Sequence, residues 1–321
     1  MKLKDWIYIW LNKYEKNIIR FRTFVKYEHY INNHIVPVLG EYNLTELTPQ
    51  VLQDFVIQKI NGGNLITGQG LAMTTTRNMV AVLKRALKKA VTLEIIEKEY
   101  TDTITLPPIS EKRVTAFEKT EQKALENYCL SHSRKNYLGI VICLYTGIRL
   151  GELLALTWDD IDFEKRLMSI NKSVCTIRRM QEKIVVIERP KTKTSVRVIP
   201  VPRQLVSILR KMKAKKRSEF VIETKTRNMV EQRSYQRTYQ RILKRIGLPY
   251  HNFHALRHTF ATRALEMGMD VKTVSEILGH KSASMTLSRY THSMMSYKID
   301  MMNKLGKELI SMQTLDKVAN Q

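Results

Sequence analysis

A chain of 321 residues is long enough for two domains with substantial cores, and its 43% hydrophobic content excludes an intrinsically disordered protein. The 54 Lys and Arg residues outnumber the 30 Asp and Glu residues, and the formal charge of +24 favours a polyanionic partner such as nucleic acid. The most apolar run, Leu138 to Tyr145, is far shorter than the roughly 18 residues of a membrane span, so no membrane contact is expected.

Residues 1–104 carry helical patterns throughout and predict a compact helical domain. Apolar residues recur there every three to four positions, and capping residues and prolines mark the helix ends. The predicted helices are one through Trp6, Trp10 and Tyr14, one from Thr23 to Val36 that is stopped by Pro37 and Gly40, one that begins with Thr48 as its N-cap, and one from Thr74 to Thr92.

The last of these predicted helices is both amphipathic and basic. Its apolar face is bordered by three cations, Lys84, Arg85 and Lys88. Because the overall charge favours a polyanionic partner, we expect these three side chains to contact it.

Residues 105–110, TLPPIS, hold two consecutive prolines and no helical pattern, which predicts an interdomain linker. The expected second domain, 111–298, combines helices with a small antiparallel β-sheet, and residues 299–321 form a tail. The fold class expected for the whole chain is therefore mostly α with a small antiparallel sheet. The predicted elements include a helix capped by Thr120 that runs to Ser131, a helix over 137–145, and strands over 161–170, 174–188 and 195–201.

The segment TGIRLGELLALTW, residues 146–158, places Arg149 and Glu152 three positions apart, and hence on one face of a predicted helix. An arginine among so many leucines needs a partner. An ion pair between these two residues explains the pattern as well as a functional site does.

The segment RPKTKTSVRVIP, residues 189–200, predicts a polar turn between two strands, with Lys191 and Lys193 at its tip. A lysine at such a tip is ordinarily solvated. Either lysine is also a candidate proton donor.

The segment HNFHALRHTFATRAL, residues 251–265, places His254 and Arg257 on the same side of a predicted helix, with His251 and His258 as competing histidines. A helix with one hydrogen-bonded histidine is the ordinary explanation. No cysteine or carboxylate lies at ligand spacing around these histidines, so a metal site is not expected.

The three cysteines also argue against a metal site. Cys129, Cys143 and Cys175 lie 14 and 32 positions apart, which matches no zinc spacing and leaves one cysteine over in any disulfide scheme. The N-terminus lacks the features of a signal peptide. We therefore expect buried, reduced thiols in a cytoplasmic protein.

The segment LGHKSASMTLSRYTHSMMSY, residues 278–297, follows a predicted helix that Asp270 caps and Gly279 ends. His280 emerges just past that helix end. Tyr290 follows ten residues later, and Tyr297 is a second tyrosine seven positions beyond it.

Two arginines, a lysine, two histidines and a tyrosine together suit phosphoryl transfer. Each arginine can bind two phosphate oxygens at once, and such a donor contributes on the order of 10² to 10³ in rate. No cluster of carboxylates would hold magnesium, so we expect a protein nucleophile and no cofactor. A tyrosine with a pKa of about 10 can serve if a histidine accepts its proton, and a lysine can protonate the departing alkoxide.

Together these motifs, in this order and at these spacings, resemble the tyrosine recombinase or phage integrase family over about residues 105–300. Residues 1–104 are similar to that family's core-type DNA-binding domain. The resemblance favours Lys191 over Lys193, because Lys191 follows Pro190 at the end of a strand, although both lysines precede a threonine. The catalytic residues implied by the resemblance are Arg149, Lys191, His254, Arg257, His280 and Tyr290, with Glu152 as a supporting residue.

The resemblance implies an enzyme that cleaves DNA through a 3′-phosphotyrosine at Tyr290 and exchanges strands through a four-way junction. The implied partners are double-stranded DNA at recombination or attachment sites, a homotetramer on that DNA, and accessory DNA-bending proteins. The tail 299–321 carries apolar residues at helical spacing, and either docking on a neighbouring protomer or packing on its own domain explains them. Neither metal nor ATP is implied. The basic stretch 203–245 adds three expected DNA contacts, Arg237, Arg241 and Lys244.

Two alternatives use the same residues differently. A type IB topoisomerase forms the same covalent link but relaxes supercoils without exchanging partners. A catalytically silent DNA-binding regulator would keep the fold and lose the reaction. Family spacing and the small helical N-terminal domain favour the recombinase over the topoisomerase, and the intact set of motifs favours it over the silent regulator.

Overall fold

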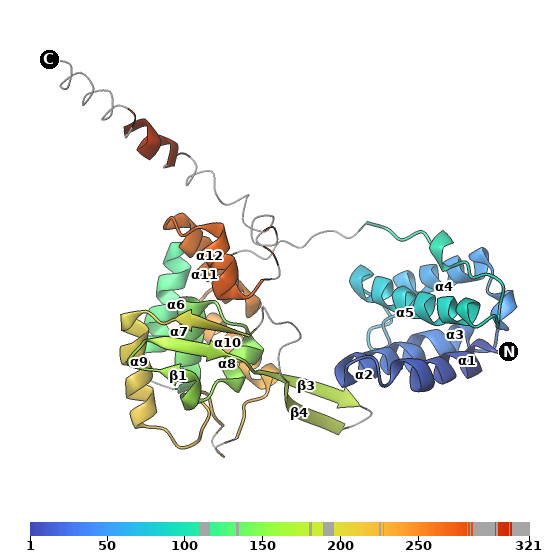
Figure 1. Ribbon diagram of the computed structural model, residues 1–321, viewed down its shortest axis with the longest axis horizontal. Coiled ribbons are helices and arrows are strands. Elements are labelled where there is room, and N and C mark those ends of the chain that lie inside the picture. The colour runs from blue at the N-terminus through green and yellow to red at the C-terminus, as the bar shows by residue number, and fades with distance from the viewer. Residues whose placement is uncertain are drawn as a thin grey trace. The chain divides into compact units, whose positions relative to one another are not determined.

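The computed structural model describes residues 1–108, 116–132, 135–179, 182–188, 196–224, 226, 228–280, 282, 284, 299, 301–307 and 309 (Figure 1). The chain divides into two compact units. Unit 1 comprises Met1–Lys112 and Ile177–Lys183, and unit 2 comprises Arg113–Thr176 and Ile184–Gln321. In the described part of the chain, no helix has both the length and the apolar character needed to cross a membrane.

Residues 1–103 are helical, as the apolar periodicity predicts. Trp6 is buried and its indole N–H donates to the Ala86 carbonyl (2.9 Å), which ties the first helix to the last. The elements are α1 (Leu3–Ile9), a π-helix (Trp10–Glu15), α2 (Phe21–Tyr30), a second π-helix (Ile31–Ile35), α3 (Val36–Leu39), a 3₁₀ turn (Leu44–Glu46), α4 (Pro49–Gly62), α5 (Met73–Thr92) and a 3₁₀ turn (Thr101–Thr103).

The predicted start of α4 is confirmed, because the Thr48 hydroxyl accepts a hydrogen bond from the Val51 N–H. Of the predicted helix end at Pro37 and Gly40, the Gly40 part is confirmed, because Gly40 is the C-cap that follows Leu39, and the Pro37 part is wrong. A π-turn over Ile31–Ile35 leads directly into α3, and Pro37 occupies one of the first two positions of that helix. The Val36 N–H still donates to the Ile31 carbonyl of this π-turn, while Pro37 has no N–H to donate, and the short helix ends at Leu39.

The first residues of the expected linker are bonded to the helices of unit 1. Gln53 on α4 exchanges two hydrogen bonds with the backbone of Thr105, at 3.2 and 2.9 Å. Arg77 on α5 donates to the Pro107 carbonyl (2.8 Å). Residues 105–107 are therefore fixed to α4 and α5.

Unit 2 combines helices with small antiparallel sheets, which confirms the predicted fold class. The elements are α6 (Lys119–Ser131), α7 (Lys135–Thr146), α8 (Leu150–Ala155), a 3₁₀ turn (Trp158–Asp160), β1 (Ile161–Asp162), β2 (Leu167–Ile170), β3 (Ser173–Arg179), β4 (Glu182–Glu188), β5 (Arg197–Pro200), α9 (Arg203–Ala214), α10 (Gln232–Arg245), α11 (His254–Glu266) and α12 (Val271–Leu278). The end of β3 and the start of β4 lie within Ile177–Lys183 and are counted with unit 1.

Two details of unit 2 differ from the prediction. The N-cap of α6 is Glu118 rather than Thr120, because the carboxylates of Glu118 and Glu121 form a reciprocal capping box. The strands form two sheets rather than one. Within the described residues, β1, β2 and β5 pair antiparallel in that order, while β3 pairs only with β4.

Helix α7 is the centre of unit 2, since α6, α8, α9, α10 and α11 all pack against it (Figure 1). Its side chains Ile140, Val141 and Cys143 are fully buried, as the apolar run predicts. Cys129 and Cys175 are also buried, and all three cysteines are free thiols. The rigid end of α7 leads into the segment that carries Arg149.

Candidate active site

The turn after α7 places Arg149 in front of a new helix. Gly147 has a φ of 66°, in the left-handed region, and a Cβ at this position would lie 2.5 Å from the Phe260 ring. Arg149 is the N-cap of α8, and Glu152 is its third residue. The expectation that both residues lie on one face of a helix is therefore wrong. They meet instead across a capping box, in which the Arg149 N–H donates to Glu152 Oε2 (2.9 Å).

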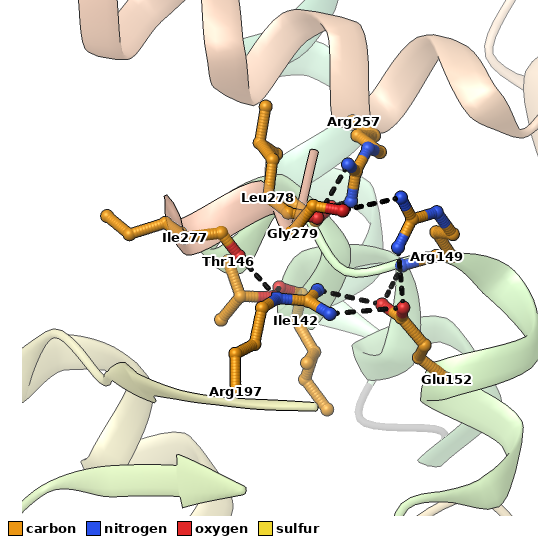
Figure 2. Close-up of polar contacts among 10 residues, drawn as sticks. Ile142, Thr146, Arg149, Glu152, Arg197, Arg257, Ile277, Leu278 and Gly279 are labelled. Carbon is orange, nitrogen blue, oxygen red and sulfur yellow. Dashed lines mark hydrogen bonds and ion pairs between the residues drawn. The ribbon is translucent and has the colours of Figure 1, made fainter. Parts of the chain in front are cut away.

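The Glu152 carboxylate is 5% exposed and is held by two arginines (Figure 2). Arg149 Nη1 donates to Oε1 at 2.8 Å. The Arg197 guanidinium binds both oxygens, at 3.1 Å to Oε1 and 2.9 Å to Oε2. Burial raises the pKa of Glu152, but the hydrogen bond and charge of Arg197 and the charge of Arg149 outweigh it and hold the pKa below its usual value.

Arg197, at the start of β5, is the residue that the sequence analysis missed. Its side chain is 7% exposed, and its Nε donates to the Ile277 carbonyl at 2.6 Å. The sequence does indicate that Arg197 is buried, because Arg197 and the buried Ile199 are two positions apart and share one face of the strand. An arginine on a buried strand face needs partners, and none lies nearby in the sequence.

Arg257 is the third arginine of the group and is 2% exposed. It donates from Nη1 to the Gly147 carbonyl (3.0 Å) and from Nη2 to the Leu278 carbonyl (2.7 Å). His254 lies one turn earlier, as the first residue of α11, and is exposed. Its ring makes an edge contact with that of the buried His258, at 4.8 Å between centroids.

The end of α12 is built as predicted. The Asp270 carboxylate accepts from the Thr273 N–H (2.9 Å) at the start, and Gly279 takes a left-handed φ of 67° at the end. The His280 N–H then donates to the Ser275 carbonyl (3.0 Å), which fixes the half-buried His280 directly after the helix.

Three successive carbonyls at this helix end each accept a hydrogen bond from a different arginine (Figure 2). Arg197 binds the Ile277 carbonyl, Arg257 that of Leu278, and Arg149 that of Gly279, the last at 3.2 Å. The C-terminal end of a helix carries partial negative charge, so it attracts cations. We call Arg149, Glu152, Arg197 and Arg257 the arginine cluster.

The arginine cluster has the properties of a site for one anion. The cluster combines three guanidinium groups with one carboxylate, so its formal charge is +2, and two of the three, Arg149 and Arg197, bind that carboxylate directly. Arg149 is 38% exposed, while Arg197 and Arg257 are enclosed. The structure thus brings Arg149, Glu152 and Arg257 together beside His280. Lys191, Lys193, Tyr290 and Tyr297 lie outside the described residues.

The basic residues expected to bind DNA have two different environments. On α10, a pocket is lined by Arg237, Arg241 and Lys244 together with Ser234 and Gln240, with no acid among those described residues. On α5, both Lys84 and Lys88 form ion pairs with Asp102, and Arg85 pairs with Glu15 at 2.9 Å. Acidic neighbours therefore offset the positive charge of α5.

Comparison with known proteins places the chain in a family. Residues 112–296 match the phage integrase family, and residues 2–60 match the N-terminal SAM-like domain of phage integrases. The chain is 30% identical to a XerC-like tyrosine recombinase of Caldanaerobacter subterraneus, over 95% of this chain and 82% of that protein. It is 26% identical to the transposase of transposon Tn916 from Enterococcus faecalis, over 84% of this chain and 69% of that protein.

Solved structures share the fold. The Tn1549 transposon integrase in complex with transposon right end DNA superposes with a TM-score of 0.77, at 21% identity, over 95% of this chain and 100% of that one. A lambda integrase tetramer bound to a Holliday junction gives a TM-score of 0.67 at 20% identity, over 88% of this chain and 78% of that one.

Proposed function

The chain belongs to the phage integrase family of tyrosine recombinases, and we propose that its arginine cluster binds the scissile phosphate during the reaction. It is a site-specific recombinase that breaks and rejoins DNA strands. The observation that carries the proposal is the convergence of Arg149 and Arg257 on the end of α12, next to His280. Their positions match those of the phosphate-binding arginines implied by the family motifs.

In the proposed reaction, Tyr290 Oη attacks the phosphorus and the bond from phosphorus to the 5′-oxygen breaks. Arg149 and Arg257 neutralise the charge on the non-bridging oxygens in the transition state. The tyrosine proton passes to a histidine, His254 or His280, and Lys191 protonates the departing 5′-oxygen, with Lys193 as its alternative.

The second half of the proposed reaction reverses the first on a new strand. The free 5′-hydroxyl of one duplex attacks the phosphotyrosine of the other, which restores the phosphodiester and releases Tyr290. The number of phosphoester bonds is unchanged over the two steps. The reaction therefore needs neither ATP nor a cofactor to supply free energy.

Glu152 supports this site without reacting. Its carboxylate stays ionised and orients the Arg149 guanidinium through the hydrogen bond to Oε1. The backbone N–H of Arg149 donates to the other oxygen, so the side chain and the main chain of Arg149 are fixed by one residue.

We propose double-stranded DNA at recombination or attachment sites as the substrate, in the cytoplasm, with accessory DNA-bending proteins as further partners. Residues 1–104 would act as the core-type DNA-binding domain, 105–110 as the linker and 111–298 as the catalytic domain. The positive side chains proposed to contact DNA phosphates are Lys84, Arg85, Lys88, Arg237, Arg241 and Lys244.

A homotetramer on two duplexes is the proposed active assembly, because two rounds of strand exchange need four nucleophiles. The lambda integrase tetramer on a Holliday junction is a fold neighbour that supports it. The tail 299–321 is proposed to dock on a neighbouring protomer. Residues 301–307 are helical, and the apolar side chains Ile299, Met302, Leu305 and Leu309 are exposed.

The test uses suicide duplexes nicked beside the cleavage site that footprinting on candidate attachment DNA identifies. The wild-type chain should form a covalent protein–DNA adduct and exchange strands between two labelled sites. Tyr290→Phe should bind the duplex but form no adduct, while the matched variant Tyr297→Phe should form it normally. An adduct formed by Tyr290→Phe would refute the assignment of the nucleophile, and adduct formation without strand exchange would indicate a topoisomerase.

A further inference from the structure

All three side-chain nitrogens of Arg197 are hydrogen-bonded within the protein, and its side chain is 7% exposed. The family motifs assign no phosphate-binding residue to this position, so we assign Arg197 no direct contact with the substrate. Two of its nitrogens bind the Glu152 carboxylate, and a third binds the Ile277 carbonyl. All of these partners belong to the walls of the proposed active site.

We propose that Arg197 is a positioning residue of the recombination reaction. It binds both oxygens of the Glu152 carboxylate, including the one that Arg149 binds, so that Arg149 keeps a positive charge for the phosphate, and it fixes the helix end that precedes His280. This inference rests on the proposed role of Arg149 in phosphate binding.

The electrostatic part follows from charge and contact geometry. Arg149 and Glu152 alone would form an ion pair with a formal charge of zero, joined at 2.8 Å, of which only Glu152 is buried. With Arg197 present, the carboxylate is shared and the three groups carry a formal charge of +1. Bidentate binding by Arg197 occupies both carboxylate oxygens, so Glu152 orients Arg149 without cancelling its charge.

The mechanical part follows from the carbonyls at the end of α12. Arg197 reaches the Ile277 carbonyl from β5, a strand that pairs with β2. Leu278 and Gly279 are held by the two proposed phosphate-binding arginines. Arg197 therefore ties the segment before His280 to the sheet, independently of the two arginines that would engage the substrate.

A purely structural role for Arg197 predicts something different. In that case its removal would lower stability and activity together, and removal of the Glu152 charge would not restore the reaction. If Arg197 instead neutralises the negative charge of Glu152, then Glu152→Gln should restore cleavage in Arg197→Met. The reason is that a neutral amide does not neutralise the positive charge of Arg149.

The test compares wild type, Arg197→Met, and Arg197→Met with Glu152→Gln in single-turnover cleavage of the nicked duplex. The cleavage rate of Arg197→Met should fall by about 10- to 100-fold, the range known for outer partners that orient metal ligands. DNA affinity should stay within about twofold, since Arg197 is enclosed. The double variant should recover a substantial part of the lost rate.

Arg263→Met is the matched control, because Arg263 is also a partly buried arginine of unit 2 that pairs with a carboxylate, Glu266, at 2.6 Å. It should cleave at the wild-type rate. If Arg197→Met does not fold, Arg197→Lys replaces it, alone and with Glu152→Gln. A wild-type rate in the Arg197 variant, or no recovery in the double variant, overturns the proposal.

Hydrogen exchange keeps this inference separate from the proposed reaction. In Arg197→Met the amide of His280, bonded to Ser275, should exchange faster than in the wild type, while amides in α6 exchange unchanged. Unchanged exchange at His280 overturns the positioning role. Absence of an adduct in the wild type would refute the proposed function alone.

Discussion

Arginines occupy two contrasting environments in unit 2. In the arginine cluster, Arg197 and Arg257 are buried and donate to backbone carbonyls and to Glu152. On α10, Arg241 is exposed and donates only locally among the described residues, to the Thr238 hydroxyl and the Arg237 carbonyl. The first arrangement fixes each guanidinium in space, whereas the second leaves it free to follow a ligand.

This contrast separates two kinds of phosphate recognition. A fixed, enclosed guanidinium stabilises one phosphate in one geometry, which serves the chemical step. A mobile, exposed one neutralises charge along the DNA backbone, which sets affinity and salt dependence. Enclosed and exposed arginines contribute equally to the net charge of +24, so the net charge does not distinguish the two kinds of phosphate recognition.

The largest expected effect is that of Arg257→Lys. Lysine keeps the charge but lacks the planar fork that now reaches both Gly147 and Leu278, so the rate of single-turnover cleavage should fall by about 10²- to 10³-fold. DNA affinity, measured by fluorescence anisotropy, should change little. A parallel fall in affinity would break the distinction between the two environments.

The triple variant of α10, Arg237→Ala with Arg241→Ala and Lys244→Ala, should lose DNA affinity and keep its cleavage rate. The DNA-binding constant decreases with salt concentration, and a plot of their logarithms has a negative slope of about 0.9 for each neutralised phosphate. Loss of three such side chains should therefore make the slope less steep by about 2.7. The cleavage rate at saturating DNA should stay at the wild-type value. An unchanged slope would show that α10 does not contact the duplex.

The buried carboxylate of the cluster predicts a pH-dependent stability. Since the pKa of Glu152 is lower in the folded chain than its usual 4.5, its contribution to stability is complete above that value and is lost as the pH falls through the lower, folded pKa. Thermal melts between pH 3 and 6 should show a smaller acid-induced decrease in Tm for Glu152→Gln. Equal decreases in the two proteins would contradict an ionised Glu152.

The smallest expected effect concerns α5, where Asp102 pairs with Lys84 and Lys88. Asp102→Asn should raise DNA affinity by a few-fold, because it releases two cations for phosphate contact. The Tm should change little, since exposed ion pairs contribute little to stability. Asp54→Asn, a carboxylate on α4 of the same unit, is the control, and an equal gain in that variant would indicate a general charge effect.

Local features were predictable from the sequence, because their causes lie within a few residues. The caps at Thr48 and Asp270 and the left-handed Gly279 depend on side chains next to the helix ends. The N-cap of α6 lies two residues before the predicted Thr120, because Glu118 is also polar and forms the capping box. The predicted helix end is confirmed at Gly40 and wrong at Pro37, because a π-turn is not visible in apolar periodicity.

The site was predictable only in part. Arg149, Glu152 and Arg257 stood out as charged residues in apolar segments, and the structure brings them together. Arg197 did not, because its partners Glu152 and Ile277 lie 45 and 80 positions away in the chain. Contacts over such separations depend on the tertiary fold, and a single sequence carries no record of them.

The three carbonyls at the end of α12 make part of the arginine cluster independent of side-chain identity. A backbone acceptor survives a replacement that preserves the helix, so substitution of the partly buried Ile277 should leave the bond to Arg197 in place. Two glycines are exceptions, since Gly147, whose carbonyl accepts from Arg257, and Gly279 have left-handed φ values of 66° and 67° that are costly for other residues. The geometry of the site is thus inherited in part through the main chain, with these two glycines as its sensitive positions.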